Sequence, residues 1–386
     1  MDIQVMEPIY IWGAGRLGVQ VMRKLQQENL QVSAFIDKNI QHKCIDDVVV
    51  MTFEEFKKQH QEENGCVLIS ATNAKNIFQM FDKLKTCPSF DVGIVKPRNL
   101  ASEFKINIQN TQDNGEIIWK NKQGKVYRII PRVEVNLIDG CNLKCKACTH
   151  FSSLYGKETI YPIKNFTKDL EGLRRVGKLL RLRLLGGEPF LIKDLDIYLD
   201  TARTIFPESD IEVVTNGLLI PEMEDRVMDA FHKNKITLII SLYPPTKHMK
   251  SQIESRLAEG DIVWRYDGNE IKEFSRNLTL TGNHDISKSS SQCLSFGCTF
   301  LRNGYLYKCP VDGLFGEFCT YYNLQIDIKN KGYSVYKNAD ELYKDIKRLA
   351  IEPTEMCKFC TETMEMIPWE VKNRPRLEDW LYNEGR

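Results

Sequence analysis

No apolar run in this sequence approaches the roughly 18 residues that a membrane-spanning helix needs. The first residues, MDIQVMEPIYIWG, also lack the charged region and long apolar stretch of a secretory signal. Neither sign of charge dominates, because 53 Lys and Arg face 52 Asp and Glu, so no basic field for nucleic acid is expected. These absences favour a cytoplasmic protein whose partners are neither membranes nor nucleic acids.

The chain has 386 residues, of which 42% are hydrophobic, and this is enough for more than one packed core. Short apolar segments alternate with helical patterns, which predicts an α/β fold built on parallel sheets. We expect a doubly wound, Rossmann-like sheet over residues 1–100, a turn-prone linker over 101–131, and strand–helix units forming a partial barrel over 132–287. An irregular, cysteine-rich domain is expected over 288–386.

Twelve cysteines in a reducing compartment favour metal binding or catalysis over structural disulfides. Three of them, Cys141, Cys145 and Cys148, stand on one short loop after an apolar segment at 133–137. Thiolates at this close spacing can hold an iron–sulfur cluster, and three ligands for four irons would leave one iron open. A zinc site completed by His150 is the alternative that the spacing leaves open.

Glycines and polar residues follow three further segments that we expect to be strands. Gly186, Gly187, Glu188 and Pro189 come after 182–185, Thr215 and Asn216 follow 211–214, and Ser241 follows 236–240. Because sites on parallel barrels lie at the carboxyl ends of the strands, these residues are expected to share one site with the cysteine loop. Taken singly, each is also an ordinary turn or cap residue.

The C-x3-C-x2-C spacing and the Gly-Gly-Glu-Pro turn resemble the radical S-adenosylmethionine (SAM) superfamily, over about residues 133–266. The resemblance implies a central partial (β/α)6 barrel whose three loop cysteines hold a 4Fe–4S cluster, with SAM bound to the open iron. In that family an electron from the cluster splits SAM into a 5′-deoxyadenosyl radical, which takes a hydrogen atom from the substrate. A flavodoxin- or ferredoxin-type electron donor is expected from the family.

The resemblance also implies roles for the residues at the strand ends. Glu188 would pair with the SAM ammonium group, beside glycines that let the backbone approach closely. Contacts to the ribose or methionyl part of SAM are expected from Thr215, Asn216 and Ser241. The aromatic residue that usually precedes the third cysteine is Ala147 here. Phe151 is the aromatic side chain that we expect to cover the adenine from the other side.

A second group of cysteines lies near the C-terminus. Its members are Cys293, Cys298, Cys309, Cys357 and Cys360. The run from Cys293 through Gly304 to Cys309 resembles the SPASM or twitch domains of some radical SAM enzymes, which implies one auxiliary 4Fe–4S cluster. Five cysteines compete for four positions, and spacing favours Cys293 over Cys298. A four-cysteine zinc site is the alternative. Cys319 has no partner at ligand spacing.

A glycine loop stands near the N-terminus. Gly13, Gly15 and Gly18 form a G-x-G-x-x-G sequence between an expected strand and helix, and Asp37 follows about twenty residues later. This context favours a nucleotide, whose phosphates would meet the helix start. The segment also resembles the N-terminal Rossmann-like domains of bacterial sugar-modifying acyltransferases, which bind a UDP-sugar. A domain used only for packing or dimerisation is the alternative.

The sequence therefore predicts a radical SAM enzyme with one auxiliary cluster, acting on a polar small molecule, and a nucleotide-linked sugar is the favoured substrate. Epimerisation, dehydration or oxidation are the expected outcomes. A peptide-modifying maturase is an alternative, although the N-terminal β/α pattern differs from the winged-helix domain that usually recognises peptides. A non-catalytic zinc or iron–sulfur scaffold is an alternative of another class, but it leaves the Gly-Gly-Glu-Pro turn unexplained.

Overall fold

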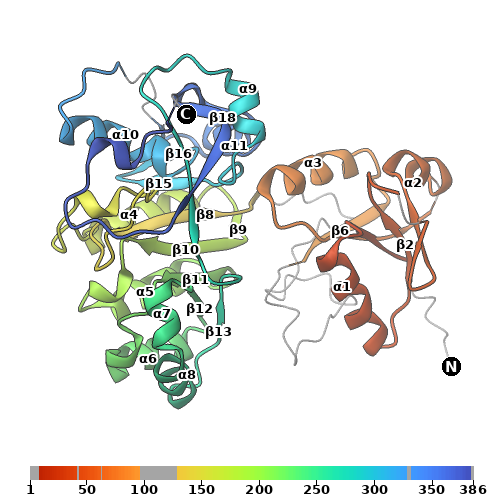
Figure 1. Ribbon diagram of the computed structural model, residues 1–386. Helices are drawn as coiled ribbons and strands as arrows, with labels where there is room; N and C mark the ends of the chain where they lie inside the picture. The colour runs from red at the N-terminus through yellow and green to blue at the C-terminus, as the bar shows by residue number, and fades with distance from the viewer. Residues whose placement is uncertain (1–7, 41–42, 62, 96–127, 328–331, 384–386) are drawn as a thin grey trace. The chain divides into compact units, whose positions relative to one another are not determined.

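The computed structural model describes residues 8–40, 43–61, 63–95, 128–327 and 332–383. The chain divides into two compact units, Met1–Pro131 and Arg132–Arg386, which we treat one at a time (Figure 1). Most of the predicted linker at 101–131 lies outside the described residues. Both units contain parallel sheets with helical crossovers, which confirms the predicted α/β fold.

The N-terminal unit is built on a six-stranded sheet with the order β3-β4-β2-β1-β5-β6. All neighbours are parallel except the β3–β4 pair. The chain winds outward from β1 in both directions, as in doubly wound sheets. The elements are β1 (Ile9–Trp12), α1 (Arg16–Gln27), β2 (Val32–Ile36), β3 (Cys44–Ile45), β4 (Val48–Met51), α2 (Phe53–Gln59), β5 (Gly65–Ile69), α3 (Ala74–Leu84), β6 (Phe90–Ile94) and β7 (Ile129–Ile130).

The local sequence explains these elements. Strand β1 reads Ile-Tyr-Ile-Trp and is buried at every position, as a central parallel strand must be when helices cover both faces. Helix α1 places Val21, Met22 and Leu25 on one face, and all three join the core beside β1 and β2. Helix α2 begins with a capping box between Thr52 and Glu55.

The C-terminal unit has one eight-stranded sheet with the order β13-β12-β11-β10-β8-β15-β16-β17. The strands of the unit, inside and outside this sheet, are β8 (Val133–Ile138), β9 (Lys178–Leu179), β10 (Arg181–Gly186), β11 (Asp210–Thr215), β12 (Thr237–Ile240), β13 (Trp264–Tyr266), β14 (Glu273–Leu278), β15 (Phe300–Arg302), β16 (Tyr305–Tyr307), β17 (Tyr333–Ser334) and β18 (Cys360–Pro368). Its helices are α4 (Ile163–Arg174), α5 (Leu195–Ile205), α6 (Asp225–Lys233), α7 (Pro244–His248), α8 (Lys250–Glu259), α9 (Ile286–Ser291), α10 (Pro310–Tyr321) and α11 (Ala339–Ile351). Short 3-10 turns include η2 (Ser152–Leu154), η3 (Pro189–Leu191), η4 (Ile220–Glu222), η5 (Glu355–Phe359) and η6 (Leu377–Asp379).

Strand β15 corrects the predicted boundary between 287 and 288. It runs parallel to β8, with Phe300 opposite Glu134 and Leu301 opposite Val135. The segment that we expected to form a separate cysteine-rich domain therefore continues the central sheet, and residues 132–386 form one compact unit. The sheet is open, with β13 and β17 as its edges among the described residues. Strand β18 pairs instead with β14, in an antiparallel two-stranded sheet.

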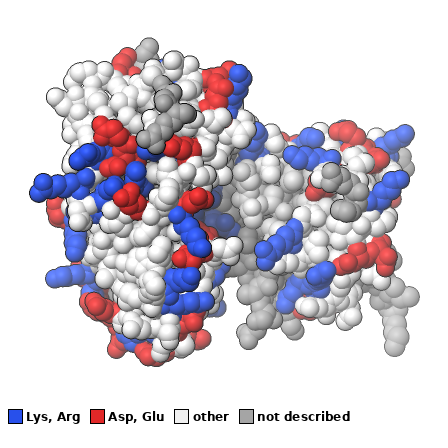
Figure 2. Space-filling model, in the orientation of Figure 1, with Lys and Arg blue, Asp and Glu red and all other residues white. Residues whose placement is uncertain are grey.

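Strands β8, β10, β11 and β12 are neighbours and parallel, so their carboxyl ends lie along one edge of the sheet. Each predicted SAM-site segment leaves the sheet from this edge. Within the described residues, no helix has the length and apolar character needed to span a bilayer. Lys and Arg side chains are interspersed with Asp and Glu on the face drawn in Figure 2, which agrees with the balanced charge of the sequence.

Candidate functional site

The loop that follows β8 carries the three cysteines into one cavity of about 540 Å³. The predicted residues that line this cavity are Cys141, Cys145, Cys148, Gly186, Gly187, Thr215, Asn216 and Ser241. They come from the carboxyl ends of four neighbouring strands, which is the convergence that the parallel order predicts. The loop and the strand ends therefore form a single site.

Burial disfavours free thiolates at two of the loop cysteines. Burial raises the pKa of Cys145 to about 12, and the neighbouring Cys148 adds to the rise. Burial also raises the pKa of Cys141, with Glu188 as the next cause. Because a thiolate must form before it can ligate, a cation bound to these buried thiols would favour their deprotonation. An iron–sulfur cluster would supply that cation, so the donor set fits the group.

Hydrogen-bond donors point at two of the three sulfurs. The backbone N–H of Leu143 donates to Cys141 Sγ at 3.3 Å, and Asn216 Nδ2 lies 3.7 Å from the same sulfur. The indole Nε1–H of Trp369 donates to Cys145 Sγ at 3.2 Å. Such donors orient metal-ligating thiolates and stabilise their negative charge.

The glycine pair lets the second strand end meet the cysteine loop. Gly187 N–H donates to Ile138 O at 2.8 Å, and Glu188 N–H donates to Gly140 O at 3.1 Å. A Cβ on Gly187 would stand 1.9 Å from Gly140 O, so no larger residue fits without moving the backbone. Gly186 has φ +142°, a conformation that side chains disfavour. The pair is therefore required to pack β10 against the residue before Cys141.

Glu188 holds the end of β11. Its side chain is 0% exposed and accepts hydrogen bonds from Thr215 Oγ1 at 2.7 Å and from Asn216 N at 2.8 Å. Burial raises its pKa to about 7, against the opposing effect of these donors and of Phe190 N–H. Neither Glu188 nor Pro189 is among the residues that line the cavity. The structure thus gives Glu188 a positioning role, and its contact with the SAM ammonium group stays a prediction.

Phe151 does not lie where we expected it. Its side chain is 1% exposed and packs against Phe318, with ring centroids 4.5 Å apart, and against Trp380. It belongs to an aromatic core under the loop and is not among the cavity-lining residues, which corrects the prediction that it covers the adenine. Its φ of 50° turns the chain at the end of the loop.

Two aromatic residues that sequence reasoning missed line the cavity. Tyr243 follows Ser241 by two positions, and Phe274 lies on β14. Tyr243 stacks on Trp369 at 5.6 Å and meets Phe274 edge to face at 6.0 Å. The position of Tyr243 just after a strand end could have predicted its place in the cavity, whereas no sequence pattern near Phe274 predicts its position there.

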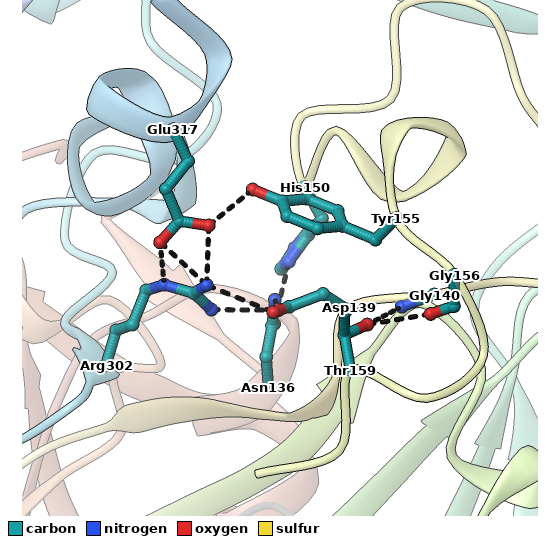
Figure 3. A network of polar contacts seen from close by, with 9 residues as sticks. All are labelled: Asn136, Asp139, Gly140, His150, Tyr155, Gly156, Thr159, Arg302 and Glu317. Atoms are coloured by element: carbon teal, nitrogen blue, oxygen red, sulfur yellow. Dashed lines mark hydrogen bonds and ion pairs between the residues drawn. The ribbon is translucent and has the colours of Figure 1, made fainter. Parts of the chain in front are cut away.

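An arginine far along the chain fixes the start of the cysteine loop (Figure 3). Arg302, at the end of β15, donates to both oxygens of Asp139 at 2.8 and 3.0 Å and also binds Glu317 on α10. Asp139 stands two residues before Cys141 and accepts a further bond from Asn136. Tyr155 donates to Glu317 at 2.8 Å and closes the network. Because both oxygens of Asp139 are bound by the same guanidinium group, the orientation of the carboxylate is fixed and its charge is balanced.

His150 was the residue on which the zinc alternative depended. Its Nδ1 lies 2.9 Å from Asn136 Oδ1, and its ring stands edge to face with Phe300. Burial lowers its pKa. Over the described part of the chain, no three His, Cys, Asp or Glu side chains converge closely enough to hold a single ion. A tetrahedral zinc brings its sulfurs within about 4 Å of one another, a tighter set than the corners of a cubane require.

The C-terminal cysteines come from separate segments of the same unit. Cys293 follows α9, Cys309 caps α10, Cys357 lies in η5 and Cys360 begins β18. Burial raises the pKa of Cys360 to about 12, and Cys293 and Cys357 add to it. Burial likewise raises the pKa of Cys309, which has Cys293 and Cys360 as neighbours. Cys293 therefore contributes to the raised pKa of both Cys309 and Cys360.

Cys298 lies in a different environment. Burial raises its pKa to about 12, and the charged groups with the next largest effects on that pKa are Glu134, Arg132 and Arg183, ahead of Cys293. The preference for Cys293 over Cys298 as a ligand stays a prediction. Lys308 is buried beside them with its Nζ 3.6 Å from the Phe296 ring centre. Burial lowers the Lys308 pKa, and the nearby thiols oppose that shift.

The N-terminal glycine loop is closely packed at two of its three glycines. A Cβ on Gly18 would meet Gly13 O at 1.8 Å, whereas no atom lies within 4 Å of a Cβ built on Gly15. Asp37 Oδ2 accepts a hydrogen bond from Ala14 N–H at 2.7 Å. Asp37 thus braces the loop, and its predicted contact with a ribose stays a prediction. The opening at Gly15 is where a phosphate could approach.

The model of the radical SAM superfamily matches residues 135–245. This part of the chain is similar to the radical SAM superfamily. The matched residues run from β8 to the start of α7 and include the cysteine loop and the ends of β10, β11 and β12. The superfamily implies a 4Fe–4S cluster and SAM.

Among curated proteins, the GTP 3′,8-cyclase of Staphylococcus aureus strain JH9 is 28% identical over 112 residues. The match covers 28% of this chain and 33% of the cyclase, so the chain spans about a third of the length of this relative. Among solved structures, BtrN in complex with AdoMet and 2-DOIA is 16% identical with a TM-score of 0.37, covering 62% of this chain and 96% of BtrN. Streptococcus suis SuiB is 19% identical with a TM-score of 0.29, covering 36% and 33%.

Proposed function

We propose that this chain is an enzyme that cleaves SAM reductively and uses the resulting radical to abstract a hydrogen atom from a polar substrate. Cys141, Cys145 and Cys148 would hold a 4Fe–4S cluster, which when bound supplies the electron that breaks the sulfonium bond of SAM. The observation that carries the proposal is that these thiols and the strand-end residues line one cavity. The electron would come from a flavodoxin- or ferredoxin-type protein.

The chain's own residues would bind and orient SAM in this cavity. Gly186 and Gly187 line the cavity at the end of β10, where the lack of a side chain lets a ligand approach the backbone. Asn216 and Ser241 offer hydrogen-bonding groups at the next two strand ends, and the Tyr243 and Phe274 rings provide an apolar wall for a flat group or a radical centre. A wall of this kind excludes water from a reactive intermediate.

The test begins with anaerobic reconstitution of the full chain with iron and sulfide. We expect iron and sulfide in equal amounts, and 5′-deoxyadenosine after addition of SAM and a strong reductant. Cys145→Ala should abolish the nucleoside product, whereas Cys44→Ala, at an exposed cysteine outside this unit, should not. Zinc without iron, or an iron-loaded protein that leaves SAM intact, would contradict the proposal and favour the scaffold alternative.

The four C-terminal thiols support a second part of the proposal, an auxiliary 4Fe–4S cluster on Cys293, Cys309, Cys357 and Cys360. Four protein ligands leave no iron open, which favours electron transfer over substrate binding. Cys309→Ala should lower the iron content from about eight to about four per chain. The matched control is Cys319→Ala, because Cys319 is buried in the neighbouring core and its pKa is raised by burial and not by another thiol. Equal iron loss in both variants would overturn the assignment.

A nucleotide-linked sugar is the substrate class that we propose. Its support is the doubly wound order of the N-terminal sheet, with a glycine loop after β1 and open space at Gly15. Calorimetry on the full chain with UDP-sugars, NAD and a short peptide separates the alternatives. We expect heat with a UDP-sugar that is lost in Gly15→Leu, which fills the open space. Binding of the peptide alone would favour the maturase alternative, and no binding of any nucleotide would leave the unit a packing domain.

A further inference from the structure

A short segment beyond β18 pairs with the cysteine loop. We call residues 369–372 the strap. Lys146 N–H donates to Glu370 O at 2.8 Å, and Lys372 N–H donates to Lys144 O at 2.8 Å. Val371 forms an antiparallel bridge with Cys145 itself. The strap therefore supports the middle of the loop along its backbone, from a position more than two hundred residues later in the chain.

Trp369, the first residue of the strap, is held from several sides. Its backbone N–H donates to Lys272 O at 2.8 Å. Its ring stacks on Tyr243 with an interplanar angle of 28° and a centroid distance of 5.6 Å. The indole Nε1–H donates to Cys145 Sγ at 3.2 Å. Because the backbone and the ring are both fixed, the indole N–H is directed at the sulfur.

A hydrogen bond to a ligating sulfur changes the electronics of a cluster. The donor stabilises negative charge on the sulfur, and the reduced cluster carries one more negative charge than the oxidised one. A donor therefore favours the reduced state and raises the reduction potential. The effect is larger at a buried site such as Cys145, because water screens it less than at the surface.

We propose that Trp369 is a positioning residue that raises the reduction potential of the cluster at Cys145 through its indole N–H. This inference rests on the proposed function, since it requires a cluster on the loop thiols. Trp369 also stacks on Tyr243, which lines the cavity, so the donor to the cluster and the wall of the cavity are held in one arrangement.

The test is the Trp369→Phe substitution in the reconstituted full chain. Phenylalanine keeps an aromatic ring against Tyr243 and removes the N–H. The measurement is a redox titration followed by electron paramagnetic resonance, using the signal that changes on addition of SAM. We expect a more negative midpoint potential, so that the reduced fraction of this cluster at a fixed potential near the wild-type midpoint falls at least about twofold. The affinity for SAM should not change.

The matched control is Trp380→Phe. Trp380 also donates its indole N–H to this loop, but to the backbone oxygen of Cys148 at 2.9 Å and not to a sulfur. We expect no change in midpoint potential in this variant. An unchanged potential in Trp369→Phe, or equal shifts in both variants, would overturn the inference while the cluster and SAM cleavage remain. Absence of any iron–sulfur cluster in the wild-type chain would instead refute the proposed function.

A second substitution tests the inference if the Trp369→Phe protein does not assemble the cluster. Benzothienylalanine at position 369 keeps the shape of the indole and replaces only the N–H with sulfur. A negative shift of the midpoint potential in that protein supports the inference, and an unshifted potential overturns it.

Discussion

The two cysteine sites of the C-terminal unit use the same ligand chemistry in different ways. The first takes three thiols from one short loop and opens into a cavity, where glycines and polar strand ends face them. The proposed second site takes four thiols from three stretches of the chain, at Cys293, at Cys309 and at the C-x-x-C pair of Cys357 and Cys360, and none of these is among the residues lining that cavity. A contiguous, incomplete set suits a site that must accept a further ligand, whereas a closed set assembled over a long stretch of chain suits electron transfer and structure.

The largest expected effect separates the two sites directly. Cys145→Ala removes a ligand of the loop site and should abolish 5′-deoxyadenosine formation. Cys360→Ala removes a ligand of the closed site and should lose about four irons per chain while SAM cleavage persists. Product analysis and iron determination on both variants check this. Loss of SAM cleavage in both would show that the sites are not independent.

The second prediction concerns the bracing of the loop. Arg302→Leu leaves Asp139 buried without its two-point partner, and this should lower the unfolding free energy of the unit by about 3 kcal/mol. Urea unfolding followed by circular dichroism measures it. The control is Arg226→Leu, whose ion pairs are exposed at the surface and should matter little. Equal stability of the two variants would refute the bracing role of Arg302.

The third prediction is a pH dependence that belongs to the loop site. The pKa of Glu188 is about 7 in the fold and 4.5 for an ordinary glutamate, so between these values the folded protein binds more protons than the unfolded one. The unfolding free energy should therefore fall as the pH rises from about 4.5 to about 7, by up to about 3 kcal/mol, and level off above. Glu188→Gln should flatten this slope in denaturation at several pH values. Glu341→Gln, at an exposed position, should keep it.

The smallest expected effect concerns which cysteines are ligands of the proposed closed site. Cys298→Ala should keep the full iron content and lower the unfolding free energy by about 1 kcal/mol, because Cys298 packs beside Glu134 and Arg132. Cys293→Ala should lose the auxiliary iron. Iron analysis of the two variants decides which cysteine is the ligand, and the reverse result would exchange their roles.

Sequence patterns predicted the residues that lie close together in the chain or at the ends of consecutive parallel strands. The cysteine loop, the glycine pair, Asn216 and Ser241 line one cavity as expected, because parallel strands bring their carboxyl ends to one edge. The bond from Trp369 to Cys145 joins residues 224 apart, and that from Arg302 to Asp139 joins residues 163 apart. Both depend on where β15 and β18 return to the unit, and no local pattern encodes that.

Phe151 is a residue for which a local pattern led to a wrong prediction. An aromatic residue just after a cysteine loop fits a ligand contact and a core position equally well by sequence. The left-handed turn at Phe151 and the rings of Phe318 and Trp380 direct it into the core. The aromatic wall of the cavity is supplied instead by Tyr243 and Phe274, from other segments.

The assignment of the loop cysteines is tested most directly by the electron paramagnetic resonance spectrum of reduced Cys309→Ala protein, in which only the loop cluster should remain. We expect one reduced 4Fe–4S signal whose g-values shift when SAM is added, because SAM would bind the open iron. A signal that SAM does not change, in protein that retains about four irons per chain, would contradict the assignment of Cys141, Cys145 and Cys148 as the SAM-binding site.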